Sequence, residues 1–587
     1  MKKIAVIIDK GKCYPDRCQH ECIKFDPINR SGGQGFHLGN DGKSCIDERL
    51  ATEMHKICAK KCPFNAITIV NLPEALKEEP IHRFGNNGFM LYGLPLFKEN
   101  KVIGILGRNG IGKSTALNIL SGGLVPNLGK FNEKSKEENV INRYSKISLG
   151  NYFKNLYDKK IKFSYKPQRV ELINKSFNGN VIDLLKKVDE KNESDRLMDE
   201  FELDKIKNRN VKYLSGGELQ KLAIIATYVK KADYYFFDEP SSFCDIKNRI
   251  KLAKLIRELS KTSSVIVVDH DLATLDYVSD EIQIVYGEPG AYGIFSQSKG
   301  INRAINEYLE GNLKEENIRY RNYSINFNPL NFRREHHNEI LIEIPHLKKH
   351  FTDFKLDVNN FNLFKGQVIA IMGANGLGKS TFLNLISGKI KSDNSDFKIS
   401  NVSYKEQDLE SRDMTVKEYL TEKGENIFND NWLKSILIEK LNLERLFEEN
   451  LKTLSGGELQ KVNIAGTLAK DVKIVLMDEP SAFIDVEDRL KVAEIIKDFA
   501  IKKEVCCIIV DHDIQFIDYL ADALLVFEGI PGKEGNVFGP FNKTEGMNRI
   551  LKSLNITYRK DDATNRARIN KEDSRLDQEQ KKKGSYY

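Results

Sequence analysis

The string LSGGELQK occurs twice in this chain, at residues 214–221 and, letter for letter, at residues 454–461. In each copy one serine and two glycines precede a segment that predicts a helix, so backbone N–H groups and a helix N-terminus are presented together. Such an arrangement binds anionic oxygen, and a phosphate is the expected ligand. Because the other motifs of the chain follow in the same order around each copy, the repeat indicates two related halves.

A glycine-rich segment precedes each copy. GRNGIGKST (residues 107–115) and GANGLGKST (373–381) both satisfy the pattern G-x-x-x-x-G-K-[ST], and the apolar segment before the first predicts the buried strand that this pattern requires. After each copy an apolar strand ends in Asp-Glu-Pro, in YYFFDEP and in IVLMDEP. This set resembles the motifs of the ABC-type ATPases and is present twice. We therefore expect an α/β fold with twin ABC-type P-loop ATPase domains.

The motifs predict two ATP sites and the residue types that serve them. The loop N–H groups cradle the phosphates, the lysine reaches the β and γ oxygens, and the serine hydroxyl holds Mg²⁺. In each Asp-Glu pair the aspartate binds the metal directly or through water, and the glutamate is the expected base that polarises the attacking water. The predicted catalytic residues are Glu239, Glu479, His270 and His512. The predicted nucleotide-binding residues are Gly107, Asn109, Gly110, Gly112, Lys113, Ser114, Thr115, Gln168, Ser215, Gly217, Asp238, Gly373, Asn375, Gly376, Gly378, Lys379, Ser380, Thr381, Gln407, Ser455, Gly457 and Asp478. The predicted magnesium ligands are Ser114, Gln168, Ser380 and Gln407.

In ABC-type ATPases two such halves face each other head to tail. Each nucleotide then lies between the glycine-rich loop of one half and the LSGGELQK string of the other. ATP in such a site cross-links the halves, because its γ-phosphate binds the closed arrangement far better than the open one. The two predicted sites are therefore Lys113 with Ser455 and Gly457, and Lys379 with Ser215 and Gly217.

The composition is that of an ordinary globular protein. The 587 residues are enough for two nucleotide-binding domains and further modules, and the formal net charge of +7 is mildly basic. No apolar run approaches the roughly 18 residues of a membrane helix, and the apolar stretch in MKKIAVIID is too short for a signal peptide. We expect a cytoplasmic monomer with two halves in one chain and no membrane partner.

The first half carries an insertion that the second half lacks. From Lys113 to Gln168 is 55 residues, but from Lys379 to Gln407 is only 28. Residues 130–162 contain the extra segment, with nine Lys or Arg against four Asp or Glu and with aromatic residues interleaved. A basic protrusion of this kind indicates contact with RNA or another phosphate backbone, and a solvated surface excursion is the alternative.

Six of the nine cysteines lie within the first 62 residues. In a chain of otherwise cytosolic character this predicts metal or cluster ligation rather than disulfides. In two-cluster ferredoxins the first three cysteines of one run share a cluster with the last cysteine of the other run. By this rule Cys13, Cys18, Cys22 and Cys62 form a complete set, whereas Asp26, Thr52 and His55 occupy three of the four positions of the second set, with only Cys58 retained.

We therefore expect one four-iron–four-sulfur cluster on the complete set and none on the other. Two alternatives remain open. The domain could hold no cluster and keep its cysteines as small core residues, or Asp26, His55 and Cys58 could bind zinc. Cys45 lies outside both runs and is expected to be structural.

The chain is predicted to divide into five parts. These are an α+β ferredoxin-like iron–sulfur domain (1–72), a first nucleotide-binding domain (73–290), a helical hinge (291–335), a second nucleotide-binding domain (336–540), and a second hinge with a charged tail (541–587). The tail from Arg559 onward is charged and poor in apolar residues, so we expect much of it to be solvated.

This organisation resembles the ABC subfamily E proteins, the RNase L inhibitor or ribosome-recycling ATPase family. The strings that carry the resemblance are KKCPFNAITIVNLP (60–73), NGIGKSTALNIL (109–120), FDEPSS (237–242), AYG (291–293) and RARIN (566–570). The resemblance implies a factor that splits ribosomes after termination or rescue, acts with the class I release factor or its rescue paralogue, and stays on the small ribosomal subunit. It also implies that the insertion within 130–162 is a helix-loop-helix that touches ribosomal RNA.

The chain departs from the family at several positions. Family members usually have all eight cluster cysteines, so the two-cluster state does not carry over. Asp269 and Asp511 precede the two histidines where Glu is usual, and Phe243 and Phe483 replace the usual Tyr. The rival functions are a ribosome-binding ABC factor that does not split ribosomes, which lacks clusters, and the ATPase subunit of a transporter, which has no use for a cysteine-rich front domain. A scaffold with inactive sites is disfavoured, because both lysines, both Asp-Glu pairs and both histidines are in place.

Overall fold

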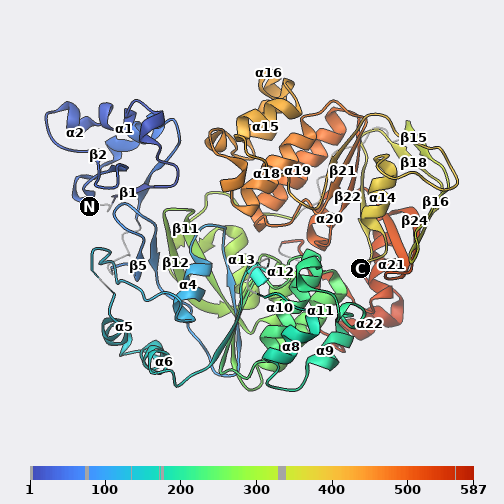
Figure 1. The fold of residues 1–587 in the computed structure, drawn as a ribbon, viewed down its shortest axis with the longest axis horizontal. Helices are drawn as coiled ribbons and strands as arrows, with labels where there is room; N and C mark the ends of the chain where they lie inside the picture. The colour runs from blue at the N-terminus through green and yellow to red at the C-terminus, as the bar shows by residue number, and fades with distance from the viewer. Residues whose placement is uncertain are drawn as a thin grey trace.

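The computed structural model describes residues 4–72, 79–133, 135–170, 172–173, 177–327, 339–561 and 564–587. A small N-terminal domain lies beside two larger halves, each built on an eight-stranded sheet (Figure 1). Residues 73–78, at the predicted start of the first nucleotide-binding domain, and residues 328–335, at the end of the predicted hinge, lie outside the described residues. Within the described ranges, no helix has both the length and the apolar character to cross a membrane.

The N-terminal domain is closed by β1 (Ile4–Ile8) and β4 (Ile67–Asn71), which pair antiparallel over their full length. Asn87, which belongs to the first half and is completely buried, joins this domain to that half. Its side chain donates to Val6 O at 3.0 Å and accepts from Ile46 N at 3.1 Å. The domain's other elements are α1 (Glu21–Lys24), α2 (Pro27–Arg30), β2 (His37–Leu38), β3 (Ser44–Cys45) and α3 (Lys56–Lys61).

The first half is organised by a sheet in the order β5-β6-β12-β11-β7-β10-β9-β8. Its centre is parallel, and alternate residues of β7 enter two separate cores: Val102 and Leu106 enter one, Ile103 and Ile105 the other. Burial on both faces explains why these strands are continuous apolar runs. The strands are β5 (His82–Arg83), β6 (Met90–Tyr92), β7 (Val102–Leu106), β8 (Phe163–Lys166), β9 (Tyr234–Asp238), β10 (Ser264–Val268), β11 (Glu281–Glu288) and β12 (Tyr292–Gly300).

Helices cover both faces of this sheet. They are α4 (Lys113–Leu120), α5 (Glu137–Tyr144), α6 (Ser148–Tyr157), α8 (Val181–Val188), α9 (Ser194–Glu200), α10 (Gly216–Tyr228), α11 (Ile246–Leu259), α12 (Leu272–Val278) and α13 (Ile301–Glu310). The insertion contains α5 and α6, which lie at the outer edge of the half in Figure 1. Its aromatic residues pack inward: Tyr144, Tyr152 and Phe153 are buried, and Tyr152 OH donates to Leu120 O at 2.5 Å. The basic residues are therefore the part of the insertion left for a partner.

The second half repeats this topology in the order β16-β17-β24-β23-β19-β22-β21-β20. Its strands are β16 (Leu347–His350), β17 (Lys355–Val358), β19 (Val368–Met372), β20 (Val402–Lys405), β21 (Ile474–Asp478), β22 (Cys506–Val510), β23 (Ala523–Ile530) and β24 (Glu534–Asn542), with a separate pair, β15 (Ile340–Ile344) and β18 (Phe361–Phe364). Its helices are α14 (Lys379–Ile386), α15 (Val416–Lys423), α16 (Asn426–Asn429), α17 (Asn431–Leu433), α18 (Gly456–Leu468), α19 (Val486–Lys502), α20 (Ile514–Leu520) and α21 (Lys543–Ser553).

The predicted helical hinge at 291–335 is wrong at its start. Residues 292–300 form β12, which pairs antiparallel with β11 and parallel with β6 inside the first sheet. The segment has few apolar residues because only some of its side chains are buried, so it gave no strand signal. The helix α13 follows directly, and β13 (Asn312–Leu313) and β14 (Ile318–Arg319) form a small hairpin.

The expectation of a solvated tail is wrong for the part up to residue 570, which contains β25 (Tyr558–Lys560) and β26 (Ala567–Ile569). The part that follows contains α22 (Arg575–Lys583), and most of residues 571–585 are exposed. Arg566 is completely buried, and the guanidinium of Arg568 makes two hydrogen bonds to Asp276 of α12, at 2.6 and 3.0 Å. Arg566 and Arg568 pair with Asp276, and Glu572 pairs with Lys254, so these charges tie the C-terminal segment to the first half.

Candidate ATP sites and iron–sulfur site

Each glycine-rich loop follows a central strand, β7 or β19, and leads into a helix that begins at its lysine. Gly112 and Gly378 cap these helices with φ angles of 91° and 88°, a left-handed conformation that favours glycine. Lys113 Nζ donates to the loop carbonyls of Gly107 and Arg108 at 2.8 and 2.6 Å, and Lys379 does the same with its own loop. Each loop thus wraps its lysine ammonium, which places a cation at the centre of the predicted phosphate site.

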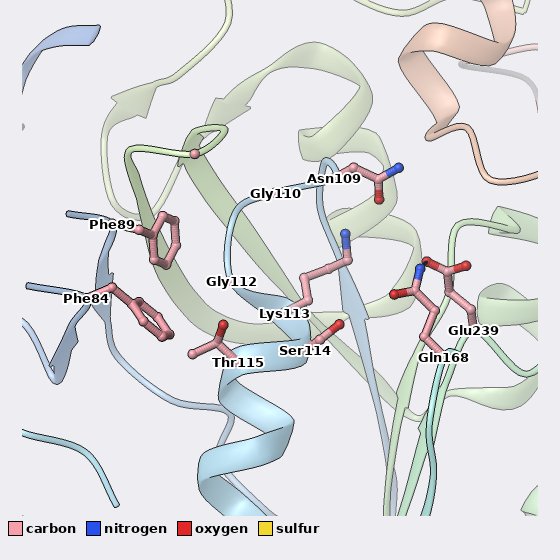
Figure 2. A pocket seen from close by; sticks show the side chains of 11 residues that line it. Phe84, Phe89, Asn109, Gly110, Gly112, Lys113, Ser114, Thr115, Gln168 and Glu239 are labelled. Atoms are coloured by element: carbon pink, nitrogen blue, oxygen red, sulfur yellow. Dashed lines mark hydrogen bonds between the residues drawn. The ribbon is translucent and has the colours of Figure 1, made fainter. Parts of the chain in front are cut away.

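A cavity of about 330 Å³ opens over the first loop (Figure 2). Its volume lies within the range of small-molecule sites. Eight predicted site residues line it: Asn109, Gly110, Gly112, Lys113, Ser114, Thr115, Gln168 and Glu239. The structure therefore brings together, around one cavity, residues that are up to 130 positions apart in the sequence.

The cavity also contains two aromatic residues that the sequence analysis missed. Phe84 and Phe89 lie on the opposite side of Lys113 from Gln168 and Glu239 (Figure 2), with ring centroids 6.3 Å apart. Phe84 is 51% exposed, so it offers an open apolar face suited to stacking a flat base. The second half has a matching pair, Phe351 and Phe354, at 6.5 Å. The signal available in the sequence was a pair of phenylalanines ahead of each central strand.

The acidic residues of the first site sit at the carboxyl end of β9. Gln168 Nε2 donates to Glu239 Oε1 at 2.7 Å, and His270 Nε2 lies 3.6 Å from the same oxygen. Burial, with the neighbouring Asp238 carboxylate, raises the pKa of Glu239 to about 7. Burial lowers the pKa of His270, which favours the neutral imidazole. The glutamate is thus held between an amide donor and a neutral ring, with a pKa suited to accepting a proton near neutral pH.

The second site repeats this geometry. Gln407 Nε2 donates to Glu479 Oε1 at 3.2 Å, and His512 Nε2 lies 3.7 Å from that oxygen. Burial and Asp478 raise the pKa of Glu479 to about 7. Ser380 Oγ donates to Asp478 Oδ2 at 2.8 Å, which joins a predicted magnesium ligand to the Asp-Glu pair. The oxygen donors that Mg²⁺ prefers are therefore gathered at this edge of the sheet.

The aspartates that replace the usual glutamates hold the next turn of the chain. Asp269 accepts from Ser241 Oγ at 2.8 Å and Ser241 N at 3.1 Å, and Asp511 accepts from Ser481 at 2.8 and 3.0 Å. These bonds fix the turn that follows each Asp-Glu-Pro. The shorter side chain therefore reaches its partners in both halves.

The two halves meet head to tail at these sites. Asn109 N donates to Asp485 Oδ2 at 3.2 Å, and Asn375 N donates to Asp245 Oδ2 at 3.0 Å, so an aspartate of each half binds the loop of the other. The LSGGELQK strings face the same loops. A Cβ built on Gly457 would lie 3.6 Å from Asn109 Nδ2, and one built on Gly217 would lie 4.0 Å from Asn375 Nδ2.

The serine of each string caps the helix that follows it. Ser215 Oγ accepts from Glu218 N at 3.3 Å and Ser455 Oγ accepts from Glu458 N at 3.4 Å, in reciprocal capping boxes. Phe243 and Phe483, where the family usually has Tyr, meet ring to ring between the halves at 5.3 Å. The interface thus joins the two strings, the two loops and the two phenylalanines in one reciprocal arrangement.

The four cysteines of the predicted cluster set lie in one part of the N-terminal domain. Cys13, Cys22 and Cys62 pack against the same small core. Ser44 N donates to Cys13 Sγ at 3.4 Å, and Ser44 Oγ lies 3.3 Å from Cys22 Sγ. Cys13 and Cys22 thus lie beside groups of the kind that hydrogen-bond the sulfurs of an iron–sulfur cluster.

A single metal ion is a different case. Across the described parts of the chain, no three His, Cys, Asp or Glu side chains are spaced to hold one ion. This spacing criterion applies to a single ion such as zinc, because a four-iron cluster holds its thiolates farther apart than one ion does. The zinc site considered for Asp26, His55 and Cys58 therefore has no support in the described residues. In place of a metal site, His55 Nε2 lies 3.4 Å from Asp26 Oδ1, and both side chains are completely buried.

Comparisons with known proteins cover nearly the whole chain. The family profile described as "ABC transporter" matches residues 96–242 and 356–482, and the one described as "Possible Fer4-like domain in RNase L inhibitor, RLI" matches residues 3–34. The chain is 40% identical to the ABC transporter E family member 1 of Arabidopsis thaliana, over 99% of this chain and 98% of that protein.

Two solved structures are similar over most of their length. One is described as a model of ribosome-bound archaeal Pelota and ABCE1, with a TM-score of 0.95, 45% identity, and coverage of 100% of this chain and 99% of that chain. The other is a crystal structure of archaeal ribosomal stalk protein aP1 with the archaeal ribosome recycling factor aABCE1, with a TM-score of 0.80, 46% identity, and coverage of 88% and 100%. The chain is therefore an ATPase with two ABC-type domains and an iron–sulfur domain. It belongs to the RNase L inhibitor family, the ABC subfamily E.

Proposed function

We propose that this protein splits ribosomes into subunits after termination or rescue and remains on the small subunit, driven by two ATP molecules bound between its halves. The observation that carries the proposal is the reciprocal contact of Asp485 with Asn109 and of Asp245 with Asn375. These contacts leave each ATP site complete only when the halves are closed. ATP binding therefore favours closure, and hydrolysis reverses it, which is a source of mechanical work.

The predicted site residues take the following roles in this proposal. The loop N–H groups and the lysines bind the phosphates, the phenylalanine pairs stack the bases, and Ser215, Gly217, Ser455 and Gly457 close over the γ-phosphate of the opposite half. Glu239 and Glu479 polarise the attacking water, each held by its glutamine and its histidine. Ser114, Gln168, Ser380 and Gln407, with Asp238 and Asp478, would hold Mg²⁺, which neutralises phosphate charge when bound.

The position of the iron–sulfur domain supports a mechanism in which closure of the two halves moves this domain relative to the second half. Its side chains reach both halves: Arg83 of the first half pairs with Glu48, and Arg17 lies 4.0 Å from Glu448 of the second half. The second contact is weak and exposed, whereas Asn87 anchors the domain to the first half through buried hydrogen bonds. Movement of the second half would therefore break a weak contact and leave the domain attached to the first half.

We assign one four-iron–four-sulfur cluster to Cys13, Cys18, Cys22 and Cys62. When bound, it would supply a rigid cross-link between the two cysteine runs. The domain division follows the sequence prediction, with residues 292–300 transferred to the first nucleotide-binding domain because they form β12. The exposed basic side chains on and around α5 and α6, among them Lys136, Lys146, Lys154 and Lys159, would contact ribosomal RNA on the small subunit.

The relatives supply the partners in this proposal. The similar structures contain archaeal Pelota with a ribosome and a ribosomal stalk protein, so we place this protein with a class I release factor or its rescue paralogue, in the cytoplasm. The test is a Glu239→Gln/Glu479→Gln double variant, which binds ATP and does not hydrolyse it. We expect this variant to co-sediment with small subunits in ATP, while the wild type converts whole ribosomes to subunits in the presence of the release or rescue factor.

Two results would contradict the proposal. The first is a double variant that sediments free of ribosomal subunits. The second is a wild-type protein that binds ribosomes and hydrolyses ATP without dissociating them, which would identify the non-splitting kind of factor.

A further inference from the structure

We propose that a buried pair in close contact, Asp26 and His55, replaces the second iron–sulfur cluster of the N-terminal domain and holds together the segments that this cluster would join. The inference extends the one-cluster assignment above, and its test separates the two. By the ferredoxin rule the second cluster would be bound at positions 26, 52, 55 and 58. Only Cys58 among them is a cysteine.

These positions still converge in the folded chain. Asp26, His55 and Cys58 are all completely buried, and Cys58 lies within electrostatic range of Asp26. The ring of Phe36 packs against His55 in an edge-to-face geometry at 5.8 Å. Three of the four positions expected for the second cluster are thus shielded from solvent in the core of the domain.

The hydrogen bonds define which atoms face one another. His55 Nδ1 faces Thr52, whose N donates to it at 3.0 Å, and His55 Nε2 lies 3.4 Å from Asp26 Oδ1. Asp26 Oδ1 accepts from Ile28 N at 2.8 Å, and Oδ2 accepts from Phe36 N. Both carboxylate oxygens of Asp26 and both ring nitrogens of His55 are therefore occupied by contacts within the domain.

The backbone has a matching feature. A Cβ built at Gly35 would overlap the Asp26 carboxylate, so glycine permits the close approach of this loop. Asp26 therefore reaches residues 28, 36 and 55, which belong to three separate segments. A cluster bound at positions 26, 52, 55 and 58 would join the segment of residue 26 to that of residues 52–58, as the contact of Asp26 with His55 does, and the residues present do not fit a cluster because three thiolates are missing.

The test compares wild type, Asp26→Ala and His55→Ala, with Cys62→Ser as the control for the first cluster, all purified anaerobically. Each protein is assayed for iron and acid-labile sulfide, and for hydrogen exchange of the peptide that contains the Phe36 amide. We expect about four iron atoms per chain in wild type and in both alanine variants. Exchange at Phe36 should accelerate by roughly 5- to 30-fold in both alanine variants, because a buried partner is left unpaired.

The outcomes separate the two proposals. Iron near zero in wild type, or unchanged in Cys62→Ser, overturns the one-cluster assignment and leaves the pair standing. Unchanged exchange in both alanine variants, or loss of iron caused by His55→Ala alone, overturns the pair. A further variant, Asp26→Cys/Thr52→Cys/His55→Cys, rebuilds the four-cysteine set with Cys58 and should raise iron to about eight per chain. A folded triple variant that stays near four would show that these positions are not the site of the second cluster.

A separate observation concerns the ATP sites. We infer that Lys166 and Lys405 are positioning residues for the catalytic glutamates. Lys166 Nζ donates to Asp238 O at 2.8 Å and Glu239 O at 3.1 Å, and Lys405 Nζ donates to Asp478 O at 2.7 Å and Glu479 O at 3.4 Å. Lys166 is completely buried and Lys405 is 3% exposed.

The held turn has a strained backbone. Glu239 and Glu479 have φ angles of 46° and 49°, a left-handed conformation that is uncommon for residues other than glycine. An ammonium that binds two successive carbonyls offsets this cost and fixes the direction of the glutamate side chain. Each string, YKPQ at 165–168 and YKEQ at 404–407, therefore contacts the catalytic glutamate in two ways. Its lysine binds the glutamate backbone, and its glutamine binds the glutamate carboxylate.

The test places Lys166→Met in a protein whose second site is silenced by Glu479→Gln. We expect kcat to fall by up to roughly 100-fold with the KM for ATP unchanged, because a misplaced base slows chemistry without weakening binding. Lys186→Met, at an exposed lysine of α8 far from either site, is the control in the same background and should leave the residual turnover unchanged. A raised KM with normal kcat for Lys166→Met, or an equal loss in the control, would overturn the inference. An arginine at position 166 that restores kcat would support it.

Discussion

Replacing Asp485 with alanine should weaken the closure of the two halves more than it weakens either half alone. The carboxylate has two tasks that the structure separates. Its Oδ1 accepts from Asp488 N at 3.1 Å and caps α19, and its Oδ2 accepts from Asn109 N of the other half at 3.2 Å. The residue is 5% exposed, so both bonds are shielded from water.

The two bonds have different consequences. Loss of an N-cap costs about 1 kcal/mol and destabilises the second half whether it is open or closed. The bond to Asn109 exists only when the halves are together, and a hydrogen bond to a charged acceptor contributes about 1.5–3 kcal/mol. Because 1.4 kcal/mol is a factor of ten, closure should require roughly 10- to 150-fold more ATP.

Closure can be measured with a fluorophore pair, one on each half, during ATP titration of Glu239→Gln/Glu479→Gln protein, which does not turn over. Asp485→Asn is the matched control, because its amide oxygen can still accept both bonds and should shift the midpoint by only a few fold. Asp245→Ala should reproduce the effect from the other site, where the corresponding bond to Asn375 N is 3.0 Å. An Asp485→Ala protein that closes at the same ATP concentration as its parent would refute the reasoning.

Three further predictions follow from single contacts. Gly457→Ala should lower steady-state ATP turnover more than Gly217→Ala, because the new Cβ would lie 2.8 Å from Phe483 O in one case and 3.3 Å from Phe243 O in the other; equal losses would contradict this. Arg568→Ala should expose the C-terminal segment to trypsin, since breaking a largely buried bidentate pair costs about 3 kcal/mol or more, whereas Arg575→Ala, whose side chain is 91% exposed, should not. Although burial opposes ionisation of Glu281, hydrogen bonds from Lys98, Ser298 and Lys101 lower its pKa to about 2, so its stabilising effect is complete above pH 4.5 and is lost as the pH falls toward 2. The thermal midpoints of wild type and Glu281→Gln should therefore differ at pH 7 and converge as the pH approaches 2, and a constant difference would refute the assignment.

The sequence predicts local structure best where the side chains of a motif bind backbone groups of the same motif, a few residues away. The loops of Lys113 and Lys379 close on carbonyls only five or six residues away, so nine letters of sequence are enough to specify their shape. Spacing rules likewise grouped Cys13, Cys18, Cys22 and Cys62 as one predicted set of cluster ligands. Such features depend on local geometry, which a string of residues encodes directly.

The sequence did not predict the structure of segments that are held in place by distant parts of the chain. Residues 292–300 are weakly apolar and become a strand because β11 and β6 supply the hydrogen bonds. Arg566 and Arg568 are charged and become buried because Asp276 lies almost three hundred positions earlier. Phe84 and Phe89 carry no motif, and only the folded chain places them against the phosphate loop.

The sequence by itself determined that this protein has two homologous ATPase halves and a cysteine-rich front domain, because each rests on residues that lie close together along the chain. Only the tertiary structure decided how the halves pair. Asn109 and Asp485 are 376 positions apart, and no local pattern of either half contains the bond between them. It also brought the buried carboxylate of Asp26 to 3.4 Å from the buried imidazole of His55, a contact that the spacing of the cysteines does not predict.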